Sequence, residues 1–205
     1  MIISDFDGLG MAVVIDLETT GFVAKSDRIV SFAAIKCDFT SLVLPPSGQI
    51  NLRTETLSEV LNPTIPIPTE ASRIHGFTDS SVVGKRTFSE AAQELREFIA
   101  EYPIVSHNMK FDGAFLDAEL ARSKAKALRT NERYCTMLAT HKRAEFITGN
   151  RMRWPRLADC GQYVGMNFSQ AEMHSAIEDA KLALMLVVGL KTTYFDEKSR
   201  RILRY

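Results

Sequence analysis

The amino-acid sequence predicts one α/β domain in which helices flank a central mixed β-sheet. A chain of 205 residues is the usual size for a single domain with a substantial core. Hydrophobic residues make up 45% of the chain, which is ordinary for a globular protein. Strand-like segments come first, and helical segments with strands between them follow, which is typical of an α/β domain. We therefore expect residues 1–205 to form one domain.

Short apolar runs rich in β-branched residues indicate the strands. Met11–Ile15 and Ile29–Ile35 have the composition of buried strands. A third strand is expected within Gln49–Leu61, after a Pro-Pro-Ser-Gly turn. Pro103–Ser106 is apolar and short, and we expect a further buried strand there.

Helices are indicated by apolar residues at helical spacing and by residues that begin or end helices. Thr69–His75 is expected to be a short helix that ends at Gly76. Thr87 and Glu90 fit a capping box, and apolar residues at helical spacing follow them. The other expected helices are Phe111–Leu120, Met137–Phe146, Leu157–Val164 and Ala176–Leu190.

Composition argues against a membrane or secreted protein. No apolar run is long enough to cross a bilayer. The first ten residues include two aspartates and no basic residue, unlike a secretory signal. The three cysteines are far apart and odd in number, so we expect free thiols in a reducing cytoplasm rather than disulfides or a metal site. They are Cys37, Cys135 and Cys160.

Basic residues are concentrated in one part of a chain whose net charge is zero. Arg122–Arg156 holds ten Lys or Arg and two Asp or Glu. A basic stretch of this kind is what a surface that follows phosphates needs. The alternative is a solvated helical face that binds nothing.

The first candidate site is the pair Asp16 and Glu18, which follows the first expected strand directly. Residues two apart on an extended chain point to the same face. Two neighbouring carboxylates repel each other unless a cation lies between them, and their hard oxygens suit Mg²⁺ or Mn²⁺. The alternative is a pair of solvated acids at the end of a strand.

Two later segments carry more acids and a histidine. In Ser106–Asp112 (SHNMKFD), an apolar strand leads to a polar turn, and Asp112 opens a helix. Asp112 could instead be a carboxylate that faces the helix dipole. In His174–Ala180 (HSAIEDA), Asp179 comes five positions after His174, so the two side chains would be about 140° apart around a helix. A shared site therefore needs His174 just before the helix; the alternative is a lone surface histidine.

Taken together and in this order, these segments resemble the DEDDh 3′→5′ exonucleases, a family that includes proofreading subunits of bacterial DNA polymerases. The resemblance covers about residues 11–190 and implies a ribonuclease-H-like fold. The matching segments are DLETTG (Asp16–Gly21), NPTIPIP (Asn62–Pro68), IHGFTD (Ile74–Asp79), SHNMKFD (Ser106–Asp112) and HSAIEDA (His174–Ala180).

The resemblance also implies a site with two metal ions, Mg²⁺ or Mn²⁺. Asp16 would bridge both ions, and Glu18 and Asp179 would complete the shell of one of them. Asp112 would support the second ion. His174 would be the general base that takes a proton from the attacking water. The products would be nucleoside 5′-monophosphates.

Substrate contacts are also implied by position within the matching segments. Each of these residues could instead cap a turn or pack in the core. They are Thr19, Thr20, His75, Phe77 and Asn108.

The segment from Arg151 to Arg156 (RMRWPR) could guide the strand by charge and stacking. Its predicted contacts are Arg151, Arg153 and Trp154. Alternatively, Trp154 packs inward and the arginines are merely solvated.

DNA, single-stranded or with a frayed 3′ end, is the preferred substrate because the LETTG form resembles the DNA-directed members. RNA is the alternative, since both polymers offer the same phosphodiester. A polymerase or other protein partner is compatible with the family. The chain ends at Tyr205, so we expect little room for a polymerase-docking tail. A stand-alone exonuclease is therefore predicted at least as strongly as a proofreading subunit. A catalytically silent scaffold would lack a carboxylate or the histidine, and all five are present. Residues 37–59 suggest no role.

Overall fold

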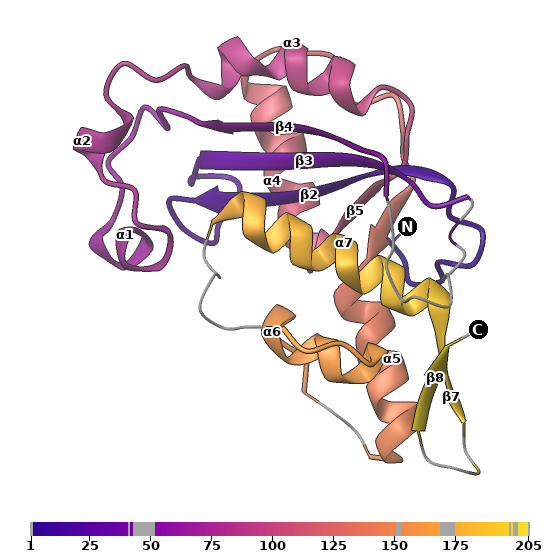
Figure 1. Ribbon diagram of the computed structural model, residues 1–205. Coiled ribbons are helices and arrows are strands. Elements are labelled where there is room, and N and C mark those ends of the chain that lie inside the picture. The colour runs from indigo at the N-terminus through magenta and orange to yellow at the C-terminus, as the bar shows by residue number, and fades with distance from the viewer. Residues whose placement is uncertain are drawn as a thin grey trace.

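The computed structural model describes residues 2–40, 42, 52–150, 153–168, 175–196, 198 and 201–204. Within these ranges the chain forms a six-stranded sheet in the order β1-β6-β5-β2-β3-β4, with a separate two-stranded ribbon, β7-β8 (Figure 1). The predicted mixed sheet is confirmed. The strands are β1 (Ile2–Ile3), β2 (Met11–Thr19), β3 (Ile29–Asp38), β4 (Thr54–Val60), β5 (Ile104–Ser106), β6 (Arg133–Cys135), β7 (Thr193–Asp196) and β8 (Arg201–Arg204).

The sheet has an antiparallel half and a parallel half that meet at β2. β2 pairs antiparallel with β3, which pairs antiparallel with β4. On its other side β2 pairs parallel with β5, followed by β6 and β1. Parallel neighbours need a crossover, and α4 (Met109–Arg122) provides it between β5 and β6.

The predicted helices are present, with small changes at their ends. Gly76 ends α1 in the left-handed conformation with φ 79°, as its sequence position predicted. The capping box of Thr87 and Glu90 begins α3. Besides α4, the helices are α1 (Thr69–His75), α2 (Asp79–Val82), α3 (Phe88–Ile99), α5 (Thr136–Thr148), α6 (Leu157–Cys160), the 3₁₀ helix η1 (Gly161–Val164) and α7 (Ala176–Thr192).

Helices cover both faces of the sheet (Figure 1). The alternation of side chains along β2 determines which of its residues point to each face. Val13, Ile15 and Leu17 face the core formed with α3 and α4. Ala12 and Val14 face the core formed with α7. Because successive side chains of a strand point to opposite faces, the next even-numbered residues of β2 also point to the α7 side.

Several elements differ from the sequence prediction. β2 does not end at Ile15 but continues through Thr19, because its ladder with β3 extends to Ile29. Asp16 and Glu18 therefore lie within the strand and do not follow it. The third strand lies within Gln49–Leu61, as predicted, and β4 covers Thr54–Val60; residues 49–51 lie outside the described ranges.

Other differences concern helices and short strands. α4 begins at Met109, two residues earlier than predicted, and Asp112 lies in its first turn. The helix predicted over 157–164 is divided into α6 and η1. The sequence analysis missed β1, β6, α2 and the β7-β8 ribbon, which are all short; β1 and β6 are also defined by contacts distant in sequence.

The three cysteines are free and buried, as expected. Within the ranges that the structure describes, none of the helices combines the length and the apolar character that crossing a bilayer requires.

Candidate active site

Asp16 and Glu18 project from β2 toward α7. They lie opposite Ala33 and Ser31 of β3, near the carboxyl end of β2. Glu18 is buried and Asp16 is half-buried. Their placement follows from the alternation of the strand, since Ala12 and Val14 on the same side pack against α7.

α7 brings the third carboxylate to this pair. Asp179 lies in the first turn of α7, as predicted, and Ser175 caps the helix by accepting from the Glu178 backbone N–H at 3.4 Å. The small, buried Ala176, Ala180 and Ala183 let the helix pack closely on the sheet. One carboxylate oxygen each from Asp16, Glu18 and Asp179 lies within 4.8 Å of the other two.

Asp16 and Glu18 in this cluster have raised pKa values because their carboxylates are buried close together without a positive charge between them. Burial and, to a smaller extent, the nearby Asp179 raise the pKa of Glu18 from 4.5 to about 7. Burial also raises the pKa of Asp16 well above its ordinary value, with contributions from Asp112, Asp179 and Glu18. A divalent cation would remove this repulsion, and carboxylate oxygens are the donors that Mg²⁺ and Mn²⁺ prefer. The residues therefore fit a metal site.

Asp112 reaches the cluster from α4, which starts at the carboxyl end of β5. The side chain is 3% exposed. Burial, with a smaller contribution from Glu18, raises its pKa to about 7, and the nearby polar groups of the Ser106 side chain and of the Asp112 and Leu17 backbones oppose the rise. Asp112 thus shares the electrostatic environment of Asp16 and Glu18. It is not one of the three carboxylates grouped within 4.8 Å.

His174 lies outside the described residues, so its position remains a prediction. Ser175 is the N-cap of α7, and His174 therefore precedes the helix in sequence, as a shared site requires. The other histidines have different surroundings. His107 contacts the Thr136 hydroxyl at 3.0 Å and the Pro155 carbonyl at 3.2 Å, and burial lowers its pKa to about 4. It is a neutral structural link between β5 and the 153–156 segment.

A pocket of about 260 Å³ opens beside Glu18, between the end of β2 and α1. Most of its lining is apolar or aromatic. Phe22, whose exposed fraction is 83%, forms one side, and its ring centroid lies 6.4 Å from that of Phe111. The lining residues are Leu17, Glu18, Thr19, Thr20, Gly21, Phe22, Pro68, Glu70, Ala71, Ile74, His75 and Phe111.

His75, Thr19 and Thr20 lie in this pocket wall, where the sequence analysis placed substrate contacts. The ring nitrogen Nδ1 of His75 accepts from the Phe77 backbone N–H at 3.1 Å, and burial lowers the pKa of the ring. Thr19 donates its hydroxyl to the Gly21 carbonyl at 2.6 Å. The Thr20 hydroxyl accepts from the Arg28 backbone N–H at 3.0 Å. Both threonines shape the turn, and their contact with substrate remains a prediction.

Phe77 and Asn108 lie in different hollows. Phe77 lines a smaller pocket of about 160 Å³ between β3, β4 and the start of α7, and its ring centroid lies 5.4 Å from that of His75. Asn108 lines a hollow of about 330 Å³ with Phe22, Lys110 and Phe111. The predicted contacts thus line three different hollows, although the rings of His75 and Phe77 are neighbours. Phe22 and Phe111, which the sequence analysis missed, line both the pocket beside Glu18 and the Asn108 hollow.

Trp154 is 58% exposed, so the alternative in which it packs inward is wrong. Its ring stacks on His141 with centroids 4.3 Å apart, and Arg153 and Arg156 beside it are exposed. Arg151 lies outside the described residues.

The basic stretch of residues 122–156 is not one continuous cationic surface. Of its nine basic side chains that the structure describes, four make internal contacts, with Glu119, Asp117, the Ser4 hydroxyl and Thr193. These four are Arg122, Arg133, Lys142 and Arg143.

A mixed sheet of this order, with helices on both faces and a carboxylate cluster near the carboxyl ends of β2 and β5, defines a ribonuclease-H-like nuclease fold. A family model described as an exonuclease, RNase T, matches residues 13–187. The chain belongs to this family of 3′→5′ exonucleases.

Similar proteins include subunits of bacterial DNA polymerases. The chain is 28% identical over 172 residues to DNA polymerase III subunit epsilon of Treponema pallidum, covering 83% of this chain and 72% of the relative. It is 26% identical over 181 residues to the epsilon subunit of Aquifex aeolicus, covering 88% and 80%. A PolC-type DNA polymerase III of Clostridium perfringens matches over 108 residues at 31% identity, 53% of this chain and 7% of the polymerase.

Solved structures of E. coli exonuclease I share the fold. Its zinc-bound complex with single-stranded DNA superposes with a TM-score of 0.69 at 17% identity, covering 89% of this chain. The chain spans 40% of the length of that exonuclease. At this identity the likeness establishes the fold alone.

Proposed function

We propose that the protein removes nucleotides one at a time from the 3′ end of single-stranded or frayed DNA, using Mg²⁺ or Mn²⁺, and releases nucleoside 5′-monophosphates. The observation that carries this proposal is the carboxylate cluster of Asp16, Glu18 and Asp179 at the edge of the pocket beside Glu18. Glu18 belongs to both the cluster and the pocket lining. A phosphodiester bond held at the cluster would therefore lie next to a terminal base held in the pocket. We treat residues 1–205 as one exonuclease domain.

The chemistry that the cluster can support is phosphodiester hydrolysis. Two bound ions would lower the pKa of the attacking water and neutralise the charge that grows on the leaving 3′ oxygen. Asp16, Glu18 and Asp179 would hold them, with Asp112 supporting the second site. The pKa values of Glu18 and Asp112, both raised to about 7 without a cation, fit carboxylates that need one in order to be charged.

His174 is the proposed general base. It would accept the proton of the water as the water attacks phosphorus. The other three histidines fit this role less well: His107 uses both ring nitrogens in internal contacts, the ring of His75 is fixed through Nδ1 in the wall of the pocket, and the ring of His141 packs against Trp154.

The shape of the pocket supports a single terminal base. Its volume of about 260 Å³ is below the roughly 300–1,000 Å³ typical of sites for drug-sized ligands. Aromatic and aliphatic walls accept any base by stacking, and a base stacked on an aromatic ring gains about 1–3 kcal/mol. Phe22 and Phe111 offer those rings.

The preceding nucleotides would pass over the hollow that contains Asn108 and Lys110, toward Trp154 with Arg153 and Arg151. The His107–Pro155 contact ties the 153–156 segment to the end of β5, next to Asn108. Lysine and arginine would contact phosphates there, and Trp154 would stack with a base.

DNA is favoured over RNA because relatives over most of this chain are DNA polymerase subunits and the similar exonuclease I structures include complexes with single-stranded DNA. These names also support a polymerase as partner. A reducing cytoplasm is supported by the three buried free thiols.

One digestion panel tests the substrate. End-labelled single-stranded DNA, duplex DNA with a mismatched 3′ end, and RNA of the same sequence are each incubated with Mg²⁺ and with Mn²⁺. We expect the single-stranded DNA and the mismatched end to be shortened faster than RNA. Faster degradation of RNA under both metals would replace DNA by RNA as the substrate.

A further inference from the structure

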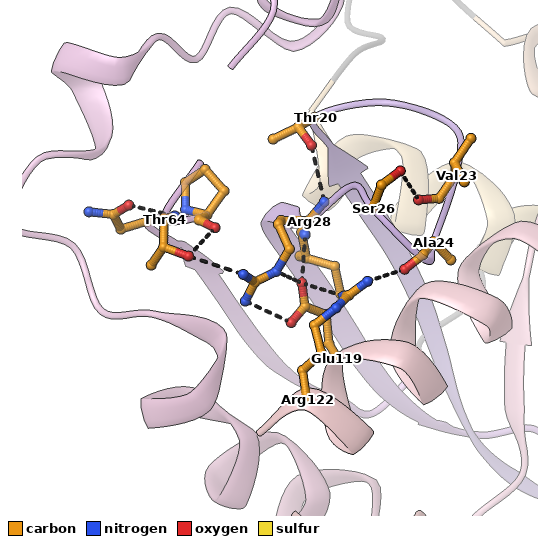
Figure 2. Close-up of polar contacts among 11 residues, drawn as sticks. Thr20, Val23, Ala24, Ser26, Arg28, Thr64, Glu119 and Arg122 are labelled. Atoms are coloured by element: carbon orange, nitrogen blue, oxygen red, sulfur yellow. Dashed lines mark hydrogen bonds and ion pairs between the residues drawn. The ribbon is translucent and has the colours of Figure 1, made fainter. Parts of the chain in front are cut away.

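A network of charged side chains lies behind the pocket beside Glu18 and joins its two walls. One wall is the turn of residues 20–28, which carries Phe22, and the other is α1 together with Pro68, the last residue of the segment of residues 62–68 that leads into this helix. Glu119 of α4 lies at the centre of the network, and its side chain is 0% exposed. Figure 2 shows its carboxylate beside the guanidinium groups of Arg28 and Arg122.

Arg28 connects α4 to the second wall. Its Nε donates to one carboxylate oxygen of Glu119 at 2.6 Å, and a terminal nitrogen donates to the other oxygen at 3.1 Å. The remaining terminal nitrogen donates to the Thr64 hydroxyl at 3.0 Å (Figure 2). One planar guanidinium therefore spans from the buried carboxylate to the 62–68 segment, a geometry that only its fixed fork provides.

The same network fastens the first wall. The backbone N–H of Arg28 donates to the Thr20 hydroxyl at 3.0 Å, and Thr20 N–H donates to the Arg28 carbonyl at 2.9 Å. Arg122 pairs with Glu119 at 3.2 Å and donates to the Ala24 carbonyl, in the middle of the turn. Both the base and the middle of the turn are thus tied to Glu119.

Thr64 has an unusual backbone conformation at the point where Arg28 holds it. Its φ is 62°, in the left-handed region that β-branched residues avoid. The Thr64 N–H donates to the Asn62 side chain at 2.9 Å, and its hydroxyl donates to the Pro63 carbonyl at 2.6 Å. Strain of this kind persists only where surrounding contacts impose it, and it is concentrated at functional sites.

We propose that Glu119 and Arg28 are positioning residues that hold the Phe22 turn and the segment leading to α1 at a fixed separation, and so set the affinity of the pocket for the 3′-terminal nucleotide. This inference rests on the proposed function. Replacing a buried ion pair by apolar residues is often neutral for stability, so stability alone is a weak reason for this pair. The contacts of this pair to both walls of the pocket give a specific reason, which is to hold the two walls in place.

We expect the carboxylate cluster to keep its arrangement when these contacts are lost. Asp112 and Glu119 are seven residues apart and lie on nearly the same face of α4, but the helix is held in the core by Phe115 and Leu116. Loosening Arg28 or Thr64 should therefore change how the nucleotide is held and leave the chemical step intact.

The experiment uses Thr64→Gly and Arg28→Lys, with Asp117→Asn as the matched control. Glycine relieves the φ of Thr64 and removes the hydroxyl, so it loosens the wall without strain. Lysine keeps the charge at Arg28 but cannot reach Glu119 and Thr64 together. Asp117 is also on α4, and it pairs with the Arg133 side chain at 2.6 Å, outside this network.

Steady-state and single-turnover degradation of single-stranded DNA separate binding from chemistry. Each pocket variant is expected to raise KM about tenfold, with kcat within about twofold of wild type, because only an interaction common to ground and transition states is lost. Asp117→Asn should leave KM unchanged. A wild-type KM in both pocket variants, with or without a lower unfolding midpoint, would make the network merely structural and overturn the proposal. A fall in kcat at constant KM would overturn it as well.

A second readout needs no nuclease activity. Lys25 is exposed in the Phe22 turn, and trypsin cleavage after it can be timed by mass spectrometry on the folded protein. Arg28→Lys and a Glu119→Gln variant should accelerate this cleavage, and Asp117→Asn should not. Unchanged cleavage would refute the positioning of the turn. Accelerated cleavage in a protein that degrades no DNA would refute the proposed function while leaving the role of the network in the turn intact.

Discussion

Replacing Glu18 by glutamine is expected to stabilise the metal-free protein at pH 8 while abolishing its activity. Burial and the neighbouring Asp179 raise the pKa of Glu18 to about 7, against 4.5 for an ordinary glutamate. The folded state therefore holds this proton more tightly than the unfolded state does. Stability is retained below about pH 4.5 and lost as pH rises through 7, by about 3 kcal/mol for this group alone. Glutamine has the same shape and no charge to bury.

The assay is urea unfolding in the presence of EDTA at pH 5 and pH 8. The free energy of unfolding of the wild type should fall between the two pH values, and that of Glu18→Gln should fall less. At pH 8 the variant should be more stable by up to about 3 kcal/mol. Glu101→Gln, at an exposed position after α3, is the control and should follow the wild type.

Adding Mn²⁺ should reverse the order of stability of the wild type and Glu18→Gln. A cation that binds the folded state alone stabilises it by mass action, so the wild type should gain stability and Glu18→Gln should gain much less. If metal-free Glu18→Gln is less stable than the wild type at pH 8, the carboxylates are not in mutual repulsion and the reasoning from burial and charge is wrong.

Three other substitutions test the remaining roles. Loss of a residue that only supports a metal ligand typically costs roughly 10–100-fold in activity. Asp179→Asn removes a proposed ligand itself, so it should lower the cleavage rate by more than this, while circular dichroism shows that the fold is retained. Near-normal activity of the variant would exclude Asp179 as a ligand. His174→Ala should lower the saturated rate by roughly 10²–10⁴-fold with unchanged metal affinity by calorimetry, and full rescue by excess Mn²⁺ would show a ligand and not a base. Neutralising Arg151, Arg153 and Arg156 together should reduce the slope of log Kd against log salt concentration, measured for single-stranded DNA, by about 2. An unchanged slope would show that these arginines do not contact the strand.

The alternation of β2 explains why the metal cluster could be predicted from sequence. Residues at i and i+2 share a face whether or not the strand ends before them, so Asp16 and Glu18 pointed together even though the end of the strand was misplaced. Asp179 was predicted in the first turn of a helix, and the N-cap at Ser175 places it there. These features depend on local spacing.

The pocket and the network behind it could not be predicted in the same way. Glu119 and Arg28 are 91 residues apart in sequence, and neither lies in a pattern that pairs them. Phe22 follows a glycine in a turn, and only the approach of α1 makes it the wall of a pocket. The parallel pairing of β6 and β1 likewise joins segments more than a hundred residues apart, and neither strand is long enough to show a period.

The central claim is that the carboxylate cluster shortens a strand from its 3′ end in a metal-dependent reaction. The most direct measurement follows single-stranded DNA labelled at its 5′ end, incubated with the wild type in Mg²⁺, in EDTA, and with Asp16→Asn in Mg²⁺. With Mg²⁺ the wild type should produce a ladder of labelled strands that shortens with time, and the other two reactions should leave the strand intact. Early release of labelled mononucleotide, internal fragments without a ladder, or equal degradation by Asp16→Asn would contradict the claim.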